Sequence, residues 1–253
     1  MTKMFLNKLC FKVIIFLYCK MPTKEEIDTF IKERLKHAKT GKVAIVLVGG
    51  PGSGKSSGKS ETVSFLNKQL TDFVNIDPDE ILTSLFNNDN NCYDDVGKIN
   101  TESFNLAIKK KKNLIFDGTG KSYKWYSKNV IKKLTKSGYR VHLVIVTNNV
   151  DTVLKRIKKR ARETGRDVDE KYTKSVYEAL NSAIPKYLDL DCSFAHAIYL
   201  FDNSSDEIKL IYKTLCDKND EKMLVCTLGN CKMPKTRKIG KSRKKTRKTR
   251  KSK

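Results

Sequence analysis

Residues 43–56 read VAIVLVGGPGSGKS. The first six of them are all apolar, which is typical of a strand buried on both faces of a parallel sheet. The last eight match the phosphate-binding pattern G-x-x-x-x-G-K-[ST] in full, and that pattern sits between a strand and a helix. In such a loop the glycines allow successive backbone N–H groups, and the start of the next helix, to face a phosphate. This stretch therefore predicts a nucleoside-triphosphate-binding loop at the end of a buried strand.

The same loop supplies the expected contacts with ATP. Lys55 is expected to reach the β- and γ-phosphates, and the hydroxyl of Ser56 is expected to bind Mg²⁺. A second Gly-Lys-Ser follows at residues 58–60, but the pattern would then need a glycine where Ser53 stands. Lys59 is therefore expected on a solvated helix face, one turn after Lys55. The predicted ATP-binding residues are Gly50, Pro51, Gly52, Ser53, Gly54, Lys55 and Ser56.

Apolar runs alternate with helical patterns along most of the chain. A capping box at residues 23–26 opens a helix before the loop strand. Strands that alternate with helices indicate a doubly wound, mainly parallel sheet with helices on both faces, which is a three-layer α/β/α P-loop NTPase. The later runs 208–215 and 223–228 predict a C-terminal hairpin, although the first also fits a helix. The expected strands are 43–48, 73–76, 114–116, 141–146 and 195–200, and the expected later helices are 101–111, 122–136, 150–163 and 169–187.

Composition divides the chain into a body and two ends. With 39% hydrophobic residues among 253, the chain can bury a core, and we expect one P-loop domain over residues 22–230. The net charge is +24, and residues 232–253 hold thirteen Lys or Arg and no acid. Residues 231–253 are therefore expected to form a disordered basic tail. Such a tail is expected to bind nucleic acid without sequence preference, to act as a nuclear-localisation signal, or to serve as a solubilising extension.

The N-terminal extension, residues 1–21, contains an apolar run at 13–19. This run is far shorter than the roughly 20 residues that span a bilayer, and residues 18–20 make a poor signal-peptide cleavage site. We expect no stable membrane span, and the extension is either a short appended segment or lies before a true start at Met21. A membrane anchor and a signal peptide are the weaker alternatives.

The cysteines bear on the compartment. There are seven, an odd number, and no two form a C-x-x-C pair. This spacing predicts neither a zinc site nor a disulfide framework. A reducing, intracellular location is therefore expected: the cytoplasm, or the nucleus if the tail is a localisation signal.

Two carboxylates, Asp77 and Asp79, follow the second expected strand. Functional residues of open α/β sheets collect at the carboxyl ends of the strands, so both are expected to face the phosphate loop. We expect Asp79 to be the general base that accepts the proton of an acceptor hydroxyl. Asp77 is expected to orient the acceptor or to hold a metal-bound water. In the alternative interpretation the pair only caps a helix and supplies an acid to its first turn.

Residues 113–120 read NLIFDGTG. An apolar strand that ends in Asp117 is the form of a carboxylate on the metal side of a phosphate loop. Asp117 is therefore expected to bind Mg²⁺ together with Ser56. Asp117 and Thr119 are both expected to bind the substrate. The alternative interpretation is that Asp117 is an ordinary turn residue.

A cationic stretch, RIKKRARETGR, fills residues 156–166. Such stretches are usually solvated helix faces, but this one runs into Thr164-Gly165, a flexible break. That composition predicts an Arg-rich helical lid whose guanidinium groups stabilise the transferred phosphate. Arg156 and Arg166 are the expected catalytic arginines, with Arg160 and Arg162 as alternates.

Taken in order, these motifs resemble the zeta-toxin family of P-loop kinases, a relative of the polynucleotide and small-molecule kinases. The resemblance covers about residues 40–205. It rests on the phosphate loop and on NIDPDE at 75–80, IFDGTG at 115–120, TGR at 164–166 and FDNS at 201–204.

The resemblance implies roles for individual residues. Asp79 matches the family's base, and Asp117 matches an acid at the substrate site that is often Glu. Arg156 and Arg166 match arginines that stabilise the transferred phosphate. Bacterial members phosphorylate a UDP-activated amino sugar at its 3′-hydroxyl. This chain departs from the pattern because Asp117 is shorter than Glu, the lid is more basic, and LTS at 82–84 replaces the family's usual Arg.

The sequence thus favours an ATP- and Mg²⁺-dependent kinase that phosphorylates a hydroxyl of a small molecule, with a UDP-activated amino sugar as the acceptor that the resemblance implies. A polynucleotide 5′-hydroxyl kinase is the first alternative, because the body and the tail are basic. A nucleotide-dependent nucleic-acid-binding protein is the second, and it would need no base such as Asp79. An antitoxin-like inhibitor would fit the family, but no sequence feature points to one.

Overall fold

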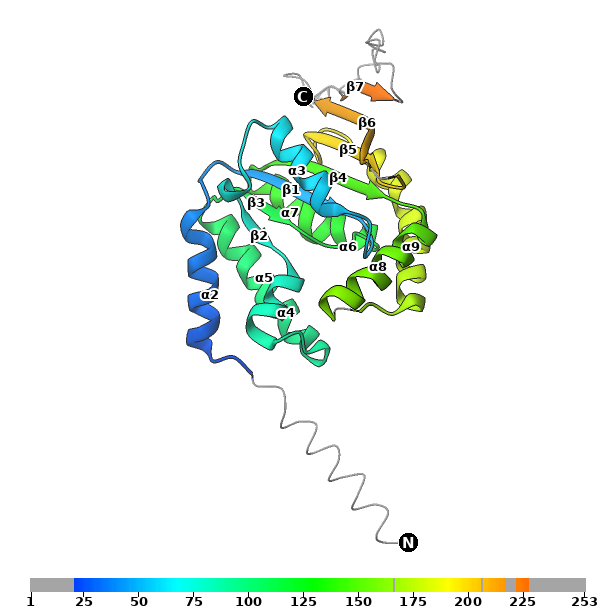
Figure 1. Cartoon of the computed structure of the whole chain (residues 1–253). Helices are drawn as coiled ribbons and strands as arrows, with labels where there is room; N and C mark the ends of the chain where they lie inside the picture. Colours follow the sequence, from blue (N-terminus) through cyan, green and yellow to red (C-terminus); the bar gives the residue numbers. More distant parts are fainter. Residues whose placement is uncertain (1–20, 166, 206, 217–221, 228–253) are drawn as a thin grey trace, which may run out of the picture.

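The computed structural model describes residues 21–165, 167–205, 207–216 and 222–227. Its strands form a seven-stranded sheet in the order β2-β3-β1-β4-β5-β6-β7, with helices on both faces (Figure 1). The first five strands pair in parallel, and β6 and β7 continue the sheet as an antiparallel hairpin. These pairings confirm the predicted mainly parallel α/β sheet with its terminal hairpin. The strands are β1 (Val43–Val48), β2 (Val74–Ile76), β3 (Leu114–Phe116), β4 (Arg140–Thr147), β5 (Ala197–Asp202), β6 (Lys209–Cys216) and β7 (Lys222–Thr227).

Helices connect the parallel strands as expected, with two differences from the sequence pattern. The expected helix 101–111 begins earlier, at Tyr93, and the expected helix 122–136 is interrupted by a π-helical stretch at Ser127–Ile131. Short 3₁₀ turns lie at 70–72 and 90–92. The α-helices are α2 (Lys24–His37), α3 (Lys55–Phe65), α4 (Pro78–Phe86), α5 (Tyr93–Lys109), α6 (Tyr123–Tyr126), α7 (Lys132–Lys136), α8 (Val150–Thr164) and α9 (Glu170–Leu188).

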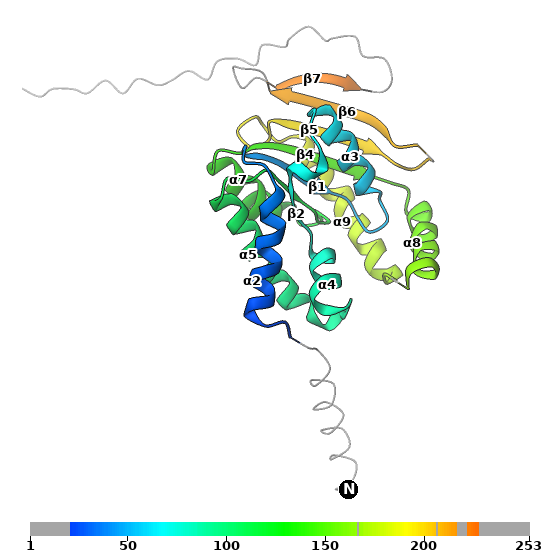
Figure 2. The same ribbon diagram turned by 60° about the vertical axis from the view of Figure 1, so that its left-hand side comes forward.

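The sheet separates two hydrophobic cores of unequal size. Side chains of a strand alternate between faces, so Ala44 and Val46 of β1 join the larger core while Ile45 and Leu47 join the smaller one. The larger core holds residues of α2, α4, α5, α7 and α9, whereas Val63 of α3 packs in the smaller core. Figure 2 shows this arrangement, with most helices on one side of the sheet and α3 on the other. β1 is therefore buried on both faces, as its unbroken apolar run predicts.

The parallel register brings the ends of several strands to one edge of the sheet. In β1, Val46 lies opposite Phe116 of β3 and Leu143 of β4. In β2, Ile76 is also level with Phe116, and the N–H of Asp117 donates to the carbonyl of Ile76 at 2.9 Å. The segments that follow β1, β2 and β3 therefore emerge side by side.

The first helix begins as predicted. Thr23 N–H donates to Glu26 Oε2 at 2.7 Å, and Glu26 N–H donates to Thr23 Oγ1 at 3.2 Å, which is a complete capping box. Ile31 and Leu35 are buried in the larger core. This packing holds α2 against β2 and α5 and turns Arg34 toward the carboxyl edge of the sheet, where it lines a cavity.

A disulfide joins Cys192, in the loop before β5, to Cys216, at the end of β6. The expectation of a chain without disulfides is wrong for this pair. The two cysteines are 24 residues apart and meet because β6 runs antiparallel to β5, placing Leu215 opposite Ala197. The spacing of cysteines along the chain carried no sign of this pairing.

Most of the N-terminal extension and all of the basic tail lie outside the described residues. Residues 1–20 and 231–253 lie outside the described residues. The domain boundaries predicted after residues 21 and 230 therefore stay predictions. Within the described ranges, no helix is both long enough and apolar enough to cross a bilayer.

Leu47→Ala should lower the free energy of unfolding by about 2–5 kcal/mol, because Leu47 is 0% exposed and its truncation leaves a cavity in the core. Leu70→Ala is the matched control, because Leu70 is 46% exposed and its truncation should cost less than about 1 kcal/mol. Urea unfolding of both variants measures the difference. Equal losses would contradict the placement of β1 at the centre of the sheet.

Candidate active site

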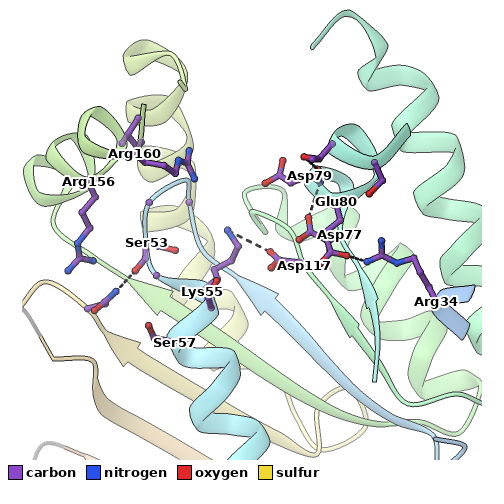
Figure 3. A pocket seen from close by; sticks show the side chains of 18 residues that line it. Arg34, Ser53, Lys55, Ser57, Asp77, Asp79, Glu80, Asp117, Arg156 and Arg160 are labelled. Carbon is purple, nitrogen blue, oxygen red and sulfur yellow. Dashed lines mark hydrogen bonds and ion pairs between the residues drawn. The ribbon is translucent and has the colours of Figure 1, made fainter. Parts of the chain in front are cut away.

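A cavity of about 830 Å³ opens at the carboxyl edge of the sheet, and we call it the cleft. The phosphate loop lies between α8 on one side and the acids that follow β2 and β3 on the other (Figure 3). The cleft is lined by Arg34, Gly50, Gly52, Ser53, Gly54, Lys55, Ser56, Ser57, Asp77, Asp79, Glu80, Thr83, Ser84, Asp117, Arg156, Ile157, Arg160 and Asn203.

The phosphate loop is shaped by its glycines. Gly52 and Gly54 adopt φ values of +70° and +90°, which side chains other than hydrogen disfavour. A Cβ on Gly54 would also lie 1.9 Å from Nδ2 of Asn203. That same Nδ2 donates to the carbonyl of Ser53 at 2.9 Å, so Asn203, which follows β5, holds the loop from outside.

A tyrosine of α9 supports the other end of the loop. The hydroxyl of Tyr177 donates to the carbonyl of Pro51 at 3.2 Å, and a Cβ on Gly50 would lie 2.4 Å from its ring. Pro51 itself does not line the cleft. The loop is thus clamped between α9 and the residue after β5, which orients it before any phosphate arrives.

Lys55 stands between the loop and the acids. Its Nζ donates to the carbonyl of Gly49 at 3.0 Å and lies 3.7 Å from Oδ1 of Asp117, as Figure 3 shows. This position agrees with the predicted role of Lys55 at the β- and γ-phosphates.

Asp117 is the most strongly perturbed acid of the cleft. Burial raises its pKa to about 6, and the positive charges of Lys55 and Lys59 oppose that rise. A carboxyl that loses hydration in this way gains from a nearby cation. Ser56 and Asp117 supply hard oxygen donors, the kind that Mg²⁺ takes in proteins, so their chemistry fits the predicted metal role.

Asp77 caps a helix and also faces the cleft. Its Oδ1 accepts the N–H of Asp79 at 2.9 Å and caps α4, and it lines the cleft as well. Burial raises the pKa of Asp77, and the neighbouring charge of Asp79 adds to that rise. Asp79 lies in the first turn of α4 and also lines the cleft. The cap therefore fixes where Asp79 stands.

Lys59 is placed differently from the sequence expectation. It is half-buried, and its charge lowers the pKa of Asp77 and of Asp117. The expectation of a solvated helix face therefore holds only in part for Lys59. One helical turn separates it from Lys55, so both ammonium groups lie on the side of α3 that faces the acids.

The remaining predicted site residues are divided by the structure. Arg156 lines the cleft together with the alternate Arg160, and Arg156 Nη2 donates to the carbonyl of Ser205 at 3.1 Å. Arg162 is exposed and does not line the cleft. Thr119 does not line it either; its carbonyl accepts the N–H of Gly49 at 3.0 Å. Arg166 lies outside the described residues.

The sequence analysis missed an ion pair on the acid side of the cleft. Arg34 of α2 pairs with Glu80, and Asn75 Nδ2 donates to Glu80 Oε1 at 2.6 Å. The guanidinium of Arg34 also lies 4.7 Å from the centre of the Phe30 ring. Arg34 precedes Asp77 by 43 residues, and nothing in the helical pattern around Arg34 indicates that its side chain reaches this site. Thr83, Ser84 and Asn203 line the cleft without having been predicted.

A family model described as Zeta toxin matches residues 28–215. No match was found among curated proteins. The structure reported for the PezAT chromosomal toxin–antitoxin system of the human pathogen Streptococcus pneumoniae is similar, with 19% identity, a TM-score of 0.58, and coverage of 76% of this chain and 81% of that one. The AvrRxo1-ORF1:-ORF2 complex with ATP is similar at 14% identity and a TM-score of 0.55, over 75% of this chain and 66% of that one. At these identities the likeness shows the fold.

The raised pKa of Asp117 predicts how stability depends on pH. Its pKa of about 6 in the folded protein lies above the ordinary value, so the folded state holds the proton more tightly than the unfolded chain does. The stability from this carboxyl is full below about pH 4 and is lost as the pH rises through about 6. Asp117→Asn should therefore be more stable than the parent at pH 7, by on the order of 1–3 kcal/mol, and nearly equal to it at pH 4.

Urea unfolding at the two pH values, without divalent ions, checks this expectation. Asp94→Asn is the control, because Asp94 is exposed and lies outside the cleft, and it should show no such dependence. If Asp117→Asn gave no added stability at pH 7, the carboxyl would not be desolvated as described.

Proposed function

This chain belongs to the zeta toxin family, and on that premise we propose that it is an ATP- and Mg²⁺-dependent phosphotransferase that moves the γ-phosphate to a hydroxyl of a small molecule. The observation that carries the proposal is the cleft, where a complete phosphate loop with Lys55 faces Asp77 and Asp79. Phosphoryl transfer needs a nucleotide cradle on one side and a group that orients the acceptor on the other.

The donor side of the cleft suits a triphosphate. Backbone N–H groups of the loop and the start of α3 would hold the phosphates, and Lys55 would reach the β- and γ-phosphates. Arg156 and Arg160 of α8 would stabilise the charge that develops on the transferred group, with Arg166 as the further arginine that the sequence predicts. The AvrRxo1-ORF1:-ORF2 complex was solved with ATP, which supports ATP as the donor.

Asp79 is the proposed general base. Its carboxylate would accept the proton of the acceptor hydroxyl while the hydroxyl oxygen attacks the γ-phosphorus and ADP leaves. Asp77 lines the cleft and would orient the acceptor. The helix cap that Asp77 forms also holds Asp79 in place. Ser56 and Asp117 would hold Mg²⁺, which supplies neutralisation of phosphate charge when it is bound.

The acid side of the cleft favours a small acceptor over a polynucleotide. Four carboxylates and Arg34 line it, with Lys55 at its border, and a polyanionic strand would be repelled by the carboxylates. The hydroxyl of Ser84 suits a polyhydroxylated acceptor, while Thr83 Oγ1 already donates to the carbonyl of Asp79 at 2.9 Å and Arg34 already pairs with Glu80. These features are compatible with a UDP-activated amino sugar as the acceptor. They make a polynucleotide 5′-hydroxyl kinase the weaker candidate function. The carboxylates are Asp77, Asp79, Glu80 and Asp117.

A protein inhibitor is a further proposed partner. The PezAT structure comes from a toxin–antitoxin system, so a family member with this cleft is a reasonable target for an antitoxin.

Asp79→Asn should reduce phosphoryl transfer by about 10²–10⁴-fold, because it keeps the shape and removes the base. ATP affinity should change little. Radiolabelled ATP with UDP-sugars, nucleosides and 5′-hydroxyl oligonucleotides identifies the acceptor, and calorimetry measures ATP binding. Lys55→Ala should instead weaken ATP binding itself.

Asp94→Asn is the matched control and should keep the parent rate. If Asp79→Asn turned over normally while Asp77→Asn did not, the two roles would be reversed. Phosphorylation of oligonucleotide acceptors alone would contradict the proposal of a small-molecule acceptor.

A further inference from the structure

A second hollow of about 700 Å³ is lined by residues of α5 and of the segment from α6 to α7. We call it the lysine groove. It shares no lining residue with the cleft, and the proposed phosphotransfer makes no use of it. Its main lining residues are Phe104, Trp125, Lys128, Lys132, Lys133 and Lys136.

The groove carries positive charge without compensation. None of the described residues that line it is acidic, and within the described part of the chain no ion pair or hydrogen bond engages the side chains of Lys128, Lys132 or Lys136. These three recur at every fourth residue of one helical segment, Lys128 in the π-helical stretch and Lys132 and Lys136 in α7, and all three line the groove. Such a row suits successive phosphates of one strand.

The fourth lysine serves the structure of the groove. Lys133 Nζ donates to Oδ1 of Asn105 and lies 5.5 Å from the centre of the Phe104 ring. Acids do occur nearby, since Asp94 and Glu102 line the adjoining hollow on α5. An anionic ligand would therefore lie toward the lysine row and away from that side of α5.

An exposed aromatic ring stands at one end of the row. Trp125 is 49% exposed, which is high for so large an apolar side chain. Its ring packs edge-on against that of buried Tyr126, with 5.4 Å between the ring centres, and this contact supports the indole. The exposed face of a supported indole ring is a stacking platform for an unpaired base.

A buried polar group in the wall of the groove lacks a partner. Asn100 is only 8% exposed, it lines the groove, and its Oδ1 accepts no hydrogen bond within the described structure. A buried acceptor of this kind normally has a donor, so the wall holds an unsatisfied group, but its oxygen is closed to solvent and is not one of the proposed contacts with a base. The π-helical stretch Ser127–Ile131 forms the opposite wall, and such stretches are frequent at functional sites.

We propose that the lysine groove binds single-stranded nucleic acid, with phosphates along Lys128, Lys132 and Lys136 and a base stacked on Trp125. The contacts carry little sequence information, because ammonium groups meet phosphates and any base presents a ring face. The proposal does not depend on the phosphotransfer proposed above.

Trp125 makes the test direct, because it is the only tryptophan of the chain and its fluorescence reports this groove even if other segments also bind nucleic acid. Titration of the full chain with a twelve-nucleotide oligo-dT should quench the emission to saturation. The logarithm of the binding constant should fall with the logarithm of salt concentration with a slope of about −2, as for three phosphate contacts.

Two double variants with the same change in net charge separate the groove from general attraction. Lys128→Glu with Lys132→Glu should weaken the binding at least tenfold, while phosphotransfer and the melting temperature stay near those of the parent. Lys32→Glu with Lys36→Glu changes two exposed lysines at the same spacing on α2, outside the groove, and should leave the affinity within about twofold.

The proposal would be overturned by no quenching, by equal weakening in the two double variants, or by equal quenching with heparin, which has no bases. A twelve-base-pair duplex that quenched as strongly as the single strand would also overturn it, since paired bases offer no free face to Trp125.

Discussion

The backbone of β1 has no access to water, since Ala44 through Val48 are all 0% exposed. Its N–H and C=O groups must therefore bond to the neighbouring strands β3 and β4, and the parallel register with both strands meets that demand. The same register makes these strands end at one edge, so the segments that follow them meet there. The phosphate loop and Asp117 come together for this reason, and the site depends on the burial of one strand.

The loop still needs support from elements far away in the chain. Asn203 holds the carbonyl of Ser53 from the end of β5, and Tyr177 of α9 holds that of Pro51. Each support also excludes larger side chains at a glycine of the loop, because a Cβ on Gly54 or Gly50 would collide with it. Glycine is thus required here both for backbone conformation and for close approach.

Charge is distributed unevenly over the molecule. The cleft sets cations of α3 and α8 against carboxylates whose burial raises the pKa of Asp77 and Asp117, an arrangement that marks it as a candidate functional site. In the lysine groove, all charged side chains among the described lining residues are cations. Tyr126 stands between the two surfaces: its hydroxyl occupies the space where a Cβ on Gly118 would lie, next to Asp117, and its ring supports Trp125.

The sequence by itself determined the phosphate loop, the order of strands and helices, and the placement of Asp77, Asp79 and Asp117 at strand ends. These features are local, because a motif, an apolar run or a cap is written in consecutive residues. Only the tertiary structure decided what crosses between elements. Arg34 reaches Glu80 because α2 packs beside β2, and Cys192 reaches Cys216 because β6 reverses along β5. Such contacts depend on how whole helices and strands pack against one another, and the spacing of residues along the chain does not encode that geometry.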